Sequence, residues 1–233
     1  NPPVVTVPAG PFGVAEGLGA NVVIAGVGVS DVDAGSTASI VVTLSVPAGQ
    51  GSLSVTEGVS GGVQSIPTNN SSTVTLTGTV AEINATLNSP GGIKYTVPDG
   101  DFNNNRAGGN VILTVTADDQ GRTGSGGAQT DTETVAITVN PVNDVPVVTV
   151  PLSAQTMNEG PGAAKVITGI RVSDVDFEEL GAADLTVTLS VPVNDGALNV
   201  ATGVAGGVTN ITGNGTETVK LAGRIAQINA TLA

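Results

Sequence analysis

Apolar and polar residues alternate over short stretches along most of this chain. "TVTLTG" at 73–78 and "TETVAITV" at 132–139 place apolar side chains at alternate positions, as expected for strands with one buried face. Clusters of Gly, Pro, Asn and Asp separate these stretches and indicate tight turns. In the first part of the chain, the pattern predicts strands over residues 3–7, 20–28, 38–46, 51–55, 73–78, 92–97, 110–117 and 131–139.

The chain also contains an internal repeat. "PVVTVP" at 3–8 returns at 146–151, displaced by 143 positions, and "INATL" at 83–87 returns at 228–232, displaced by 145. The displacement grows because the second copy has a longer insertion around "FEELGAAD". Collinear matches of this kind indicate two copies of one structural unit.

The repeat predicts a complete domain over 1–142 and a second domain over 143–233 that is truncated at its C-terminus. The second copy lacks counterparts of "GIKYTVP" (92–98), "NVILTVTADD" (110–119) and "TETVAITVN" (132–140). Without these strands, a sheet edge and one side of the core would be uncovered, which favours pairing with another chain. Alternatively, the division into domains differs from the division into repeats. From its abrupt start at "NPPVVTV", we expect the chain to be a piece of a larger protein.

One segment has helical rather than strand spacing. "TVAEINATL" at 79–87 places Val80, Ile83 and Leu87 on one helical face, behind Thr79 as a candidate N-cap. The predicted fold is therefore all-β, with at most one short helix per repeat. Many short strands without helical crossovers are typical of a Greek-key β-sandwich.

Composition narrows the chemistry that this chain can perform. A net charge of −13 opposes binding to nucleic acid or to an anionic membrane, and no apolar run is long enough to insert into a bilayer. The chain has no Cys and no His, which removes thiol chemistry, disulfides and the most common general base. Carboxylate and amide oxygens are the remaining candidates for binding or catalysis.

An alternating pair of carboxylates occurs at the same place in both copies. "VSDVD" at 29–33 returns at 172–176, and its two Asp side chains lie at same-face positions of an extended segment. Such a pair can chelate a hard cation such as calcium, which takes six to eight oxygen ligands. The alternative is that each Asp ends a strand through turn hydrogen bonds and is solvated. Neither copy matches an EF-hand loop, because the twelfth position is Val42 or Leu185 instead of Glu.

Further acidic motifs resemble those of bacterial cadherin-like repeats of large secreted or surface adhesins. These motifs are the Glu of "AEG" after the first strand, the "SDVD" pair, the A-x-D-x-G pattern in "ADDQG" and the Asn-Asp of the linker "PVNDVP". The segment "YTVPDGDFNNN" is also similar to such repeats. The linker departs from the cadherin pattern because it lacks the Asp that normally precedes Asn-Asp. No clear DRE-type motif occurs, although Asp99 or Asp101 is a candidate substitute.

The resemblance implies a tandem cadherin/immunoglobulin-like sandwich with calcium bound at the ends of the domains. At the junction of the two repeats, the implied ligands are Glu16, Asn143 through its backbone carbonyl, Asp144, Asp174 and Asp176. At the opposite end of the first repeat, the implied ligands are Asp31, Asp33 and Asp119. The alternative is an acidic linker without metal.

The leading functional hypothesis is a structural spacer or adhesion module of an extracellular bacterial protein, secreted or at the cell surface. Its partners would be calcium ions and adjacent repeats of the parent protein, with homophilic or other protein contacts through sheet edges. The alternative is a β-sandwich module that binds a carbohydrate or protein ligand without calcium regulation. Aromatic residues make up only 2% of the chain, which argues against a sugar site.

We do not expect an enzyme. Paired carboxylates can serve as acid and base in a glycosidase, but here they lie on predicted loop tips with no aromatic cleft. A Lys–Asn isopeptide bond through Lys94, Lys165 or Lys220 is a further alternative, and it would need a buried triad of Lys, Asn and an acid that the sequence does not identify.

Overall fold

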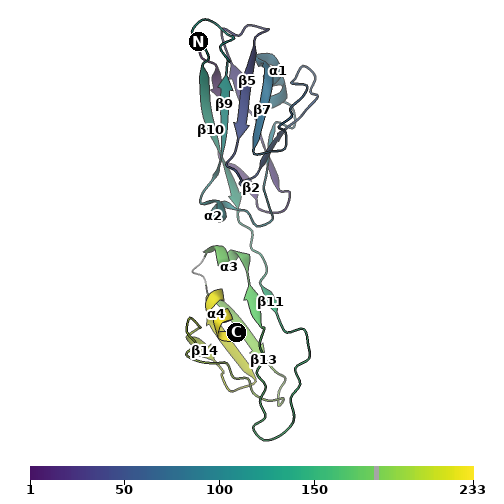
Figure 1. Cartoon of the computed structure of the whole chain (residues 1–233), viewed down its shortest axis with the longest axis vertical. Helices are drawn as coiled ribbons and strands as arrows, with labels where there is room; N and C mark the ends of the chain where they lie inside the picture. The colour runs from purple at the N-terminus through teal and green to yellow at the C-terminus, as the bar shows by residue number, and fades with distance from the viewer. Residues whose placement is uncertain (181–183) are drawn as a thin grey trace. The chain divides into compact units, whose positions relative to one another are not determined.

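The computed structural model describes residues 1–180 and 184–233 and is mostly β, with four short helices in the described part of the chain (Figure 1). The chain divides into two compact units: unit 1 covers Asn1–Val142 and unit 2 covers Asn143–Ala233. None of the described helices has the length and apolar character that are needed to cross a bilayer.

The larger sheet of unit 1 has five strands. In spatial order these are β2 (Phe12–Ala15), β10 (Thr130–Asn140), β9 (Val111–Asp118), β5 (Ser39–Ser45) and β7 (Thr73–Thr79). β2 runs parallel to β10, and the other neighbours are antiparallel. β5 is an interior strand, because β7 pairs with it along its whole length and β9 pairs with it from Val41 to Ser45.

Two smaller sheets complete the β structure of unit 1. One has three antiparallel strands, β3 (Asn21–Ile24), β8 (Ile93–Thr96) and β6 (Ser52–Val55). The other pairs β1 (Val4–Thr6) with β4 (Gly28–Ser30). The predicted strands agree with these elements, except that β2 and β4 were not expected as separate strands.

Side chains from these sheets form one buried cluster. Alternate residues of β5, Ile40, Val42 and Leu44, are each 0% exposed, as the alternating pattern predicts. The only tyrosine, Tyr95 on β8, is also fully buried, and its hydroxyl donates a 2.8 Å hydrogen bond to the Gln50 carbonyl. Burial raises the pKa of Tyr95 to about 12. The core is therefore built largely from Val, Ile and Leu.

The predicted helix is α1 (Val80–Leu87), and it begins with a capping box. The Thr79 hydroxyl accepts a hydrogen bond from the Glu82 amide, while the Glu82 carboxylate accepts one from the Thr79 amide at 2.8 Å. The backbone hydrogen bond from Thr79 lowers the pKa of Glu82. Asn84 joins α1 to β4, because its side chain donates to the Val29 carbonyl and accepts from the Val29 amide.

Unit 2 repeats part of this architecture. β11 (Val147–Thr149) pairs with β12 (Arg171–Ser173), as β1 does with β4. A second sheet has the order β13 (Leu185–Ser190), β15 (Thr218–Gly223) and β14 (Asn210–Thr212). Its smaller buried cluster consists of Val172, Val208, Val219, Leu221, Ile228 and Leu232.

The expectation of at most one short helix per repeat is wrong. Unit 1 also contains α2 (Asn104–Ala107), and unit 2 contains both α3 (Val175–Leu180) and α4 (Ile225–Leu232). α4 is the counterpart of α1. α2 and α3 have only four and six residues, too few for a helical period to be recognised in the sequence. The insertion around "FEELGAAD" begins within α3, and its residues 181–183 lie outside the described part of the chain.

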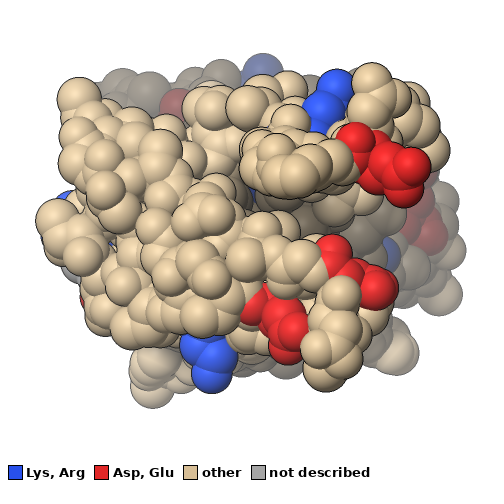
Figure 2. Space-filling view, turned by 90° about the horizontal axis from the view of Figure 1, so that it is seen from below, with Lys and Arg blue, Asp and Glu red and all other residues tan. Residues whose placement is uncertain are grey.

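Unit 2 exposes more apolar surface at positions that are buried in unit 1. Val5 on β1 is 5% exposed, whereas its counterpart Val148 on β11 is 59% exposed. Likewise, Ile24 is 0% exposed and its counterpart Ile167 is 42% exposed. The face drawn in Figure 2 is covered mainly by residues other than Lys, Arg, Asp and Glu. The packing of unit 2 is therefore less complete than that of unit 1.

Candidate metal-binding carboxylates

The candidate ligands of unit 1 form two separate groups. β10, with 11 residues, is about 36 Å long at roughly 3.3 Å per residue. Asp119 accepts a hydrogen bond from the Gln129 amide, which directly precedes β10, while Glu16 donates its amide to the carbonyl of Asn140 at the end of this strand. The two groups therefore lie at opposite ends of β10.

Asp119 is the most enclosed carboxylate of the first group. It is 0% exposed, and its Oδ1 accepts hydrogen bonds from the amides of Gly121 and Gln129, each at 2.8 Å. Its Oδ2 lies 3.1 Å from the Thr123 hydroxyl oxygen. The backbone hydrogen bonds, first that from Gln129 and then that from Gly121, lower the pKa of Asp119 against the opposing effect of burial.

Thr123 brings Asp31 and Asp119 together. Its hydroxyl oxygen is 3.0 Å from Asp31 Oδ2 and 3.1 Å from Asp119 Oδ2. A hydroxyl has only one hydrogen to donate, so the two carboxylates share this donor. The other oxygen of Asp31 accepts from the amides of Asp33 and Ala34, which is the turn hydrogen bonding that the sequence offered as an alternative to calcium. Asp31 thus closes a turn with one oxygen and directs the other toward Asp119.

Asp33 makes its contact with the start of the chain. Its Oδ2 accepts a hydrogen bond from the amino group of Asn1. In the repeat, Asn1 corresponds to Asp144 and Asp33 corresponds to Asp176. In unit 2 the Asp144 amide donates to Asp176 Oδ2 at 2.6 Å, so the same backbone nitrogen contacts the same carboxylate oxygen in both copies.

Acidification should test the role of Asp119. Because its pKa is lowered in the folded state, the ionised carboxylate stabilises unit 1 above the unfolded pKa of about 3.9. This contribution is lost as pH falls through the lower folded-state pKa. We expect the free energy of unfolding of unit 1, followed by Tyr95 fluorescence in metal-free buffer, to fall below about pH 4. The fall should be smaller in Asp119→Asn, and equal slopes in the two proteins would contradict this role.

Glu16 occupies the other end of unit 1 and is only 9% exposed. Its Oε2 accepts a 2.7 Å hydrogen bond from Asn103 Nδ2, and its Oε1 accepts one from the Val142 amide. Glu16 therefore holds the last residue of unit 1 by its backbone. A buried carboxylate with directed partners is not a solvated surface charge.

Asn103 orients Glu16, and the sequence did not identify this role. It is 1% exposed and is the N-cap of α2, where its Oδ1 accepts from the amides of Asn105 and Arg106. The amide group thus joins Glu16 to the helix start. Asp99, considered above as a substitute ligand, forms a 2.9 Å ion pair with Arg106.

The candidate ligands of unit 2 surround the start of α3. Asp174 is 4% exposed, and its Oδ1 accepts a 3.3 Å hydrogen bond from the Phe177 amide. Asp176 lies within the first turn of α3 and holds the Asp144 amide, as described above. Asn143 is exposed, and its side-chain amide donates to the Asp144 carbonyl at 2.9 Å.

Glu16 of unit 1 and Asp144 and Asp176 of unit 2 offer carboxylate oxygens that could coordinate a metal ion. Carboxylate oxygen is the ligand type that calcium and magnesium prefer. No protein-family model matches this chain, and no curated protein does. The function must therefore be inferred from the residues themselves.

Proposed function

We propose that this chain is a structural spacer of an extracellular bacterial protein, in which calcium stiffens the linker between two cadherin-like repeats. The observation that carries this proposal is the hydrogen bonding of the linker backbone. The Val142 amide donates to Glu16 in unit 1, and the Asp144 amide donates to Asp176 in unit 2. In each unit, a carboxylate thus holds the adjoining end of the linker by a hydrogen bond to its backbone.

The carboxylates of Glu16 and Asp176 accept hydrogen bonds from two amides of the same short segment. Only Asn143 separates Val142 from Asp144. Two residues of extended chain span at most about 7 Å, so the two amide nitrogens cannot be farther apart than that. Carboxylates tethered in this way repel each other, and a divalent cation relieves the repulsion.

The proposed ligand set fits calcium better than a transition metal. It consists of the carboxylates of Glu16, Asp144, Asp174 and Asp176 with the backbone carbonyl of Asn143. Calcium takes six to eight oxygen ligands in flexible geometry, and waters complete the shell. Asp31, Asp33 and Asp119 form the equivalent group at the other end of unit 1, where we propose that they bind calcium shared with a preceding repeat.

The proposed fold of each repeat is a Greek-key β-sandwich. In unit 1, this is supported by the five-stranded and three-stranded sheets, whose apolar side chains belong to one buried cluster. A rigid sandwich with an aliphatic core suits a spacer. The net charge of −13 over the whole chain favours a soluble spacer, and an extracellular location supplies the calcium that weak sites require.

Calorimetric titration of the whole chain with calcium tests this proposal. We expect a dissociation constant on the order of 10⁻⁴ to 10⁻³ M, as for other extracellular modules. The double variant Asp144→Asn/Asp176→Asn keeps the side-chain shapes and should weaken binding by about tenfold or more. A matched control, Asp184→Asn/Asp195→Asn, removes the same charge elsewhere in unit 2 and should bind as the parent does.

A distance measurement tests stiffening separately from binding. Because the chain has no Cys, spin labels can be attached at Ala48→Cys in unit 1 and Ala197→Cys in unit 2, both at exposed positions. Calcium should narrow the distribution of distances between the labels. Binding without narrowing would refute the spacer mechanism, and no binding at all would favour a ligand-binding or partner-binding module without calcium regulation.

A further inference from the structure

We propose that the free edge of β13 and the apolar groove beside it bind an extended strand with the alternating sequence of β9, in antiparallel orientation. This proposal concerns unit 2 alone and does not depend on calcium.

The first observation is the unequal pairing of two equivalent strands. β5 in unit 1 pairs with β7 on one edge and with β9 on the other. β13 has the counterpart sequence, but among the strands of the described residues it pairs with β15 alone. Its free edge presents backbone donors and acceptors that another strand can use.

The second observation is a groove of about 500 Å³ next to this edge. The apolar side chains that line it include Val148 and Val150 near β11 and Leu185, Val187 and Leu189 on β13. The three β13 side chains are half-buried, whereas their counterparts on β5 are fully buried. Covering apolar surface that is exposed in this way lowers the free energy and so favours binding of a partner.

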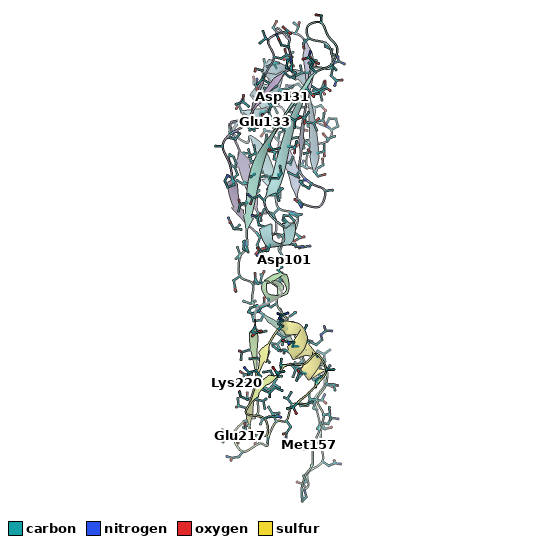
Figure 3. The ribbon with its side chains drawn as sticks, turned by 90° about the vertical axis from the view of Figure 1, so that its left-hand side faces the viewer. Asp101, Asp131, Glu133, Met157, Glu217 and Lys220 are labelled. Carbon is teal, nitrogen blue, oxygen red and sulfur yellow. The ribbon has the colours of Figure 1, made fainter. Side chains whose placement is uncertain are left out.

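Unit 1 indicates which partner fits. There β1 packs against β9 and β10, and the Val5 amide donates a 2.7 Å hydrogen bond to Asp131, which lies on β10 with Glu133 (Figure 3). β9 turns Val111, Leu113, Val115 and Ala117 inward, each at most 1% exposed. The occupant of the unit 2 groove should therefore be a strand with small aliphatic residues at alternate positions.

The repeat also predicts the register. In unit 1 Val41 lies opposite Asp118, and Ser45 lies opposite Thr114. The counterparts of Val41 and Ser45 in β13 are Thr186 and Ser190. A strand with the sequence of β9 should accordingly place its residue 118 opposite Thr186 and its residue 114 opposite Ser190. Adding a strand to an exposed sheet edge is an established mode of peptide recognition.

The test uses the whole chain and a synthetic peptide with the sequence of residues 108–121. We expect saturable binding by fluorescence anisotropy of a labelled peptide, and slower hydrogen exchange at those amides of Leu185–Ser190 that point away from β15. Replacing Leu113 and Val115 by Lys in the peptide should abolish binding, because these two side chains point into the core when the same sequence forms β9 in unit 1. This control does not require any change in the protein.

A pair of protein variants tests the groove. Val148→Lys introduces a charge at a position that is already 59% exposed, so unit 2 should remain folded, and far-UV circular dichroism checks this. It should weaken peptide binding by about tenfold or more. Val193→Lys, at a residue that is 74% exposed and does not line the groove, should have no effect.

Three results would overturn the proposal. The first is protection from exchange outside β13 instead of within it, and the second is equal binding of the two peptides. The third is a dimer, seen by sedimentation, in which β13 is already protected and the peptide cannot compete, since the occupant would then be a second copy of this chain.

Discussion

Replacing Leu44 by alanine should destabilise unit 1 by about 2–5 kcal/mol, the usual cost of a large-to-small change in a close-packed core. Leu44 is 0% exposed and lies on β5, an interior strand of the five-stranded sheet that is flanked by β7 and β9. Collapse of the neighbouring strands into the cavity is restricted, because the ladders that β5 forms with β7 and with β9 hold both neighbours in place. Urea unfolding followed by Tyr95 fluorescence measures this loss for unit 1 specifically, since the chain has one Tyr and no Trp.

The internal repeat supplies a matched control for this substitution. Leu189 is the counterpart of Leu44, but it is only half-buried at the free edge of unit 2. Leu189→Ala removes the same atoms from a site that is partly solvated, so the loss should be nearer 1 kcal/mol. Calorimetry of the unit 2 transition gives this value. Equal losses at the two positions would mean that unit 2 is as completely packed as unit 1.

Replacing Gly51 by alanine should destabilise unit 1 by about 3 kcal/mol or more. Gly51 has φ +115°, a backbone conformation that L-residues rarely adopt. A Cβ there would also lie 2.4 Å from Tyr95 Cε2 and 2.7 Å from the Thr96 carbonyl oxygen. Tyr95 cannot move away, because its ring is buried and its hydroxyl is held by Gln50. Tyr95 fluorescence during urea unfolding measures the loss.

Gly49→Ala separates backbone strain from collision in the same loop. Gly49 also has a positive φ, +79°, but an added Cβ would have no atom within 4 Å. The expected cost is therefore that of strain alone, about 1 kcal/mol. If the two variants lost the same stability, the contact with Tyr95 would not be the main cause at Gly51.

The outcomes of the sequence predictions follow from how local each signal is. The α1 helix was predicted together with its cap, because Thr79, Glu82 and the apolar face all lie within nine consecutive residues. β2 has only four residues, and its partner β10 lies some 125 positions away, so no local pattern marks it. Asn103 and Thr123 were missed for a similar reason. Asn103 donates a hydrogen bond to a carboxylate 87 positions away, and Thr123 donates to one that is 92 positions away.

The amino-acid sequence by itself determined the β-rich architecture, the α1 helix and the repeat, because side-chain alternation, turn residues and caps act over a few neighbouring positions. It also identified the acidic positions. Only the tertiary structure decided that Asp31 and Asp119 share the Thr123 hydroxyl, that Glu16 is buried against Asn103, and that β13 is the strand whose edge is free. These contacts depend on which distant strands pair, and strand pairing is decided by the burial of the whole core and not by any one segment.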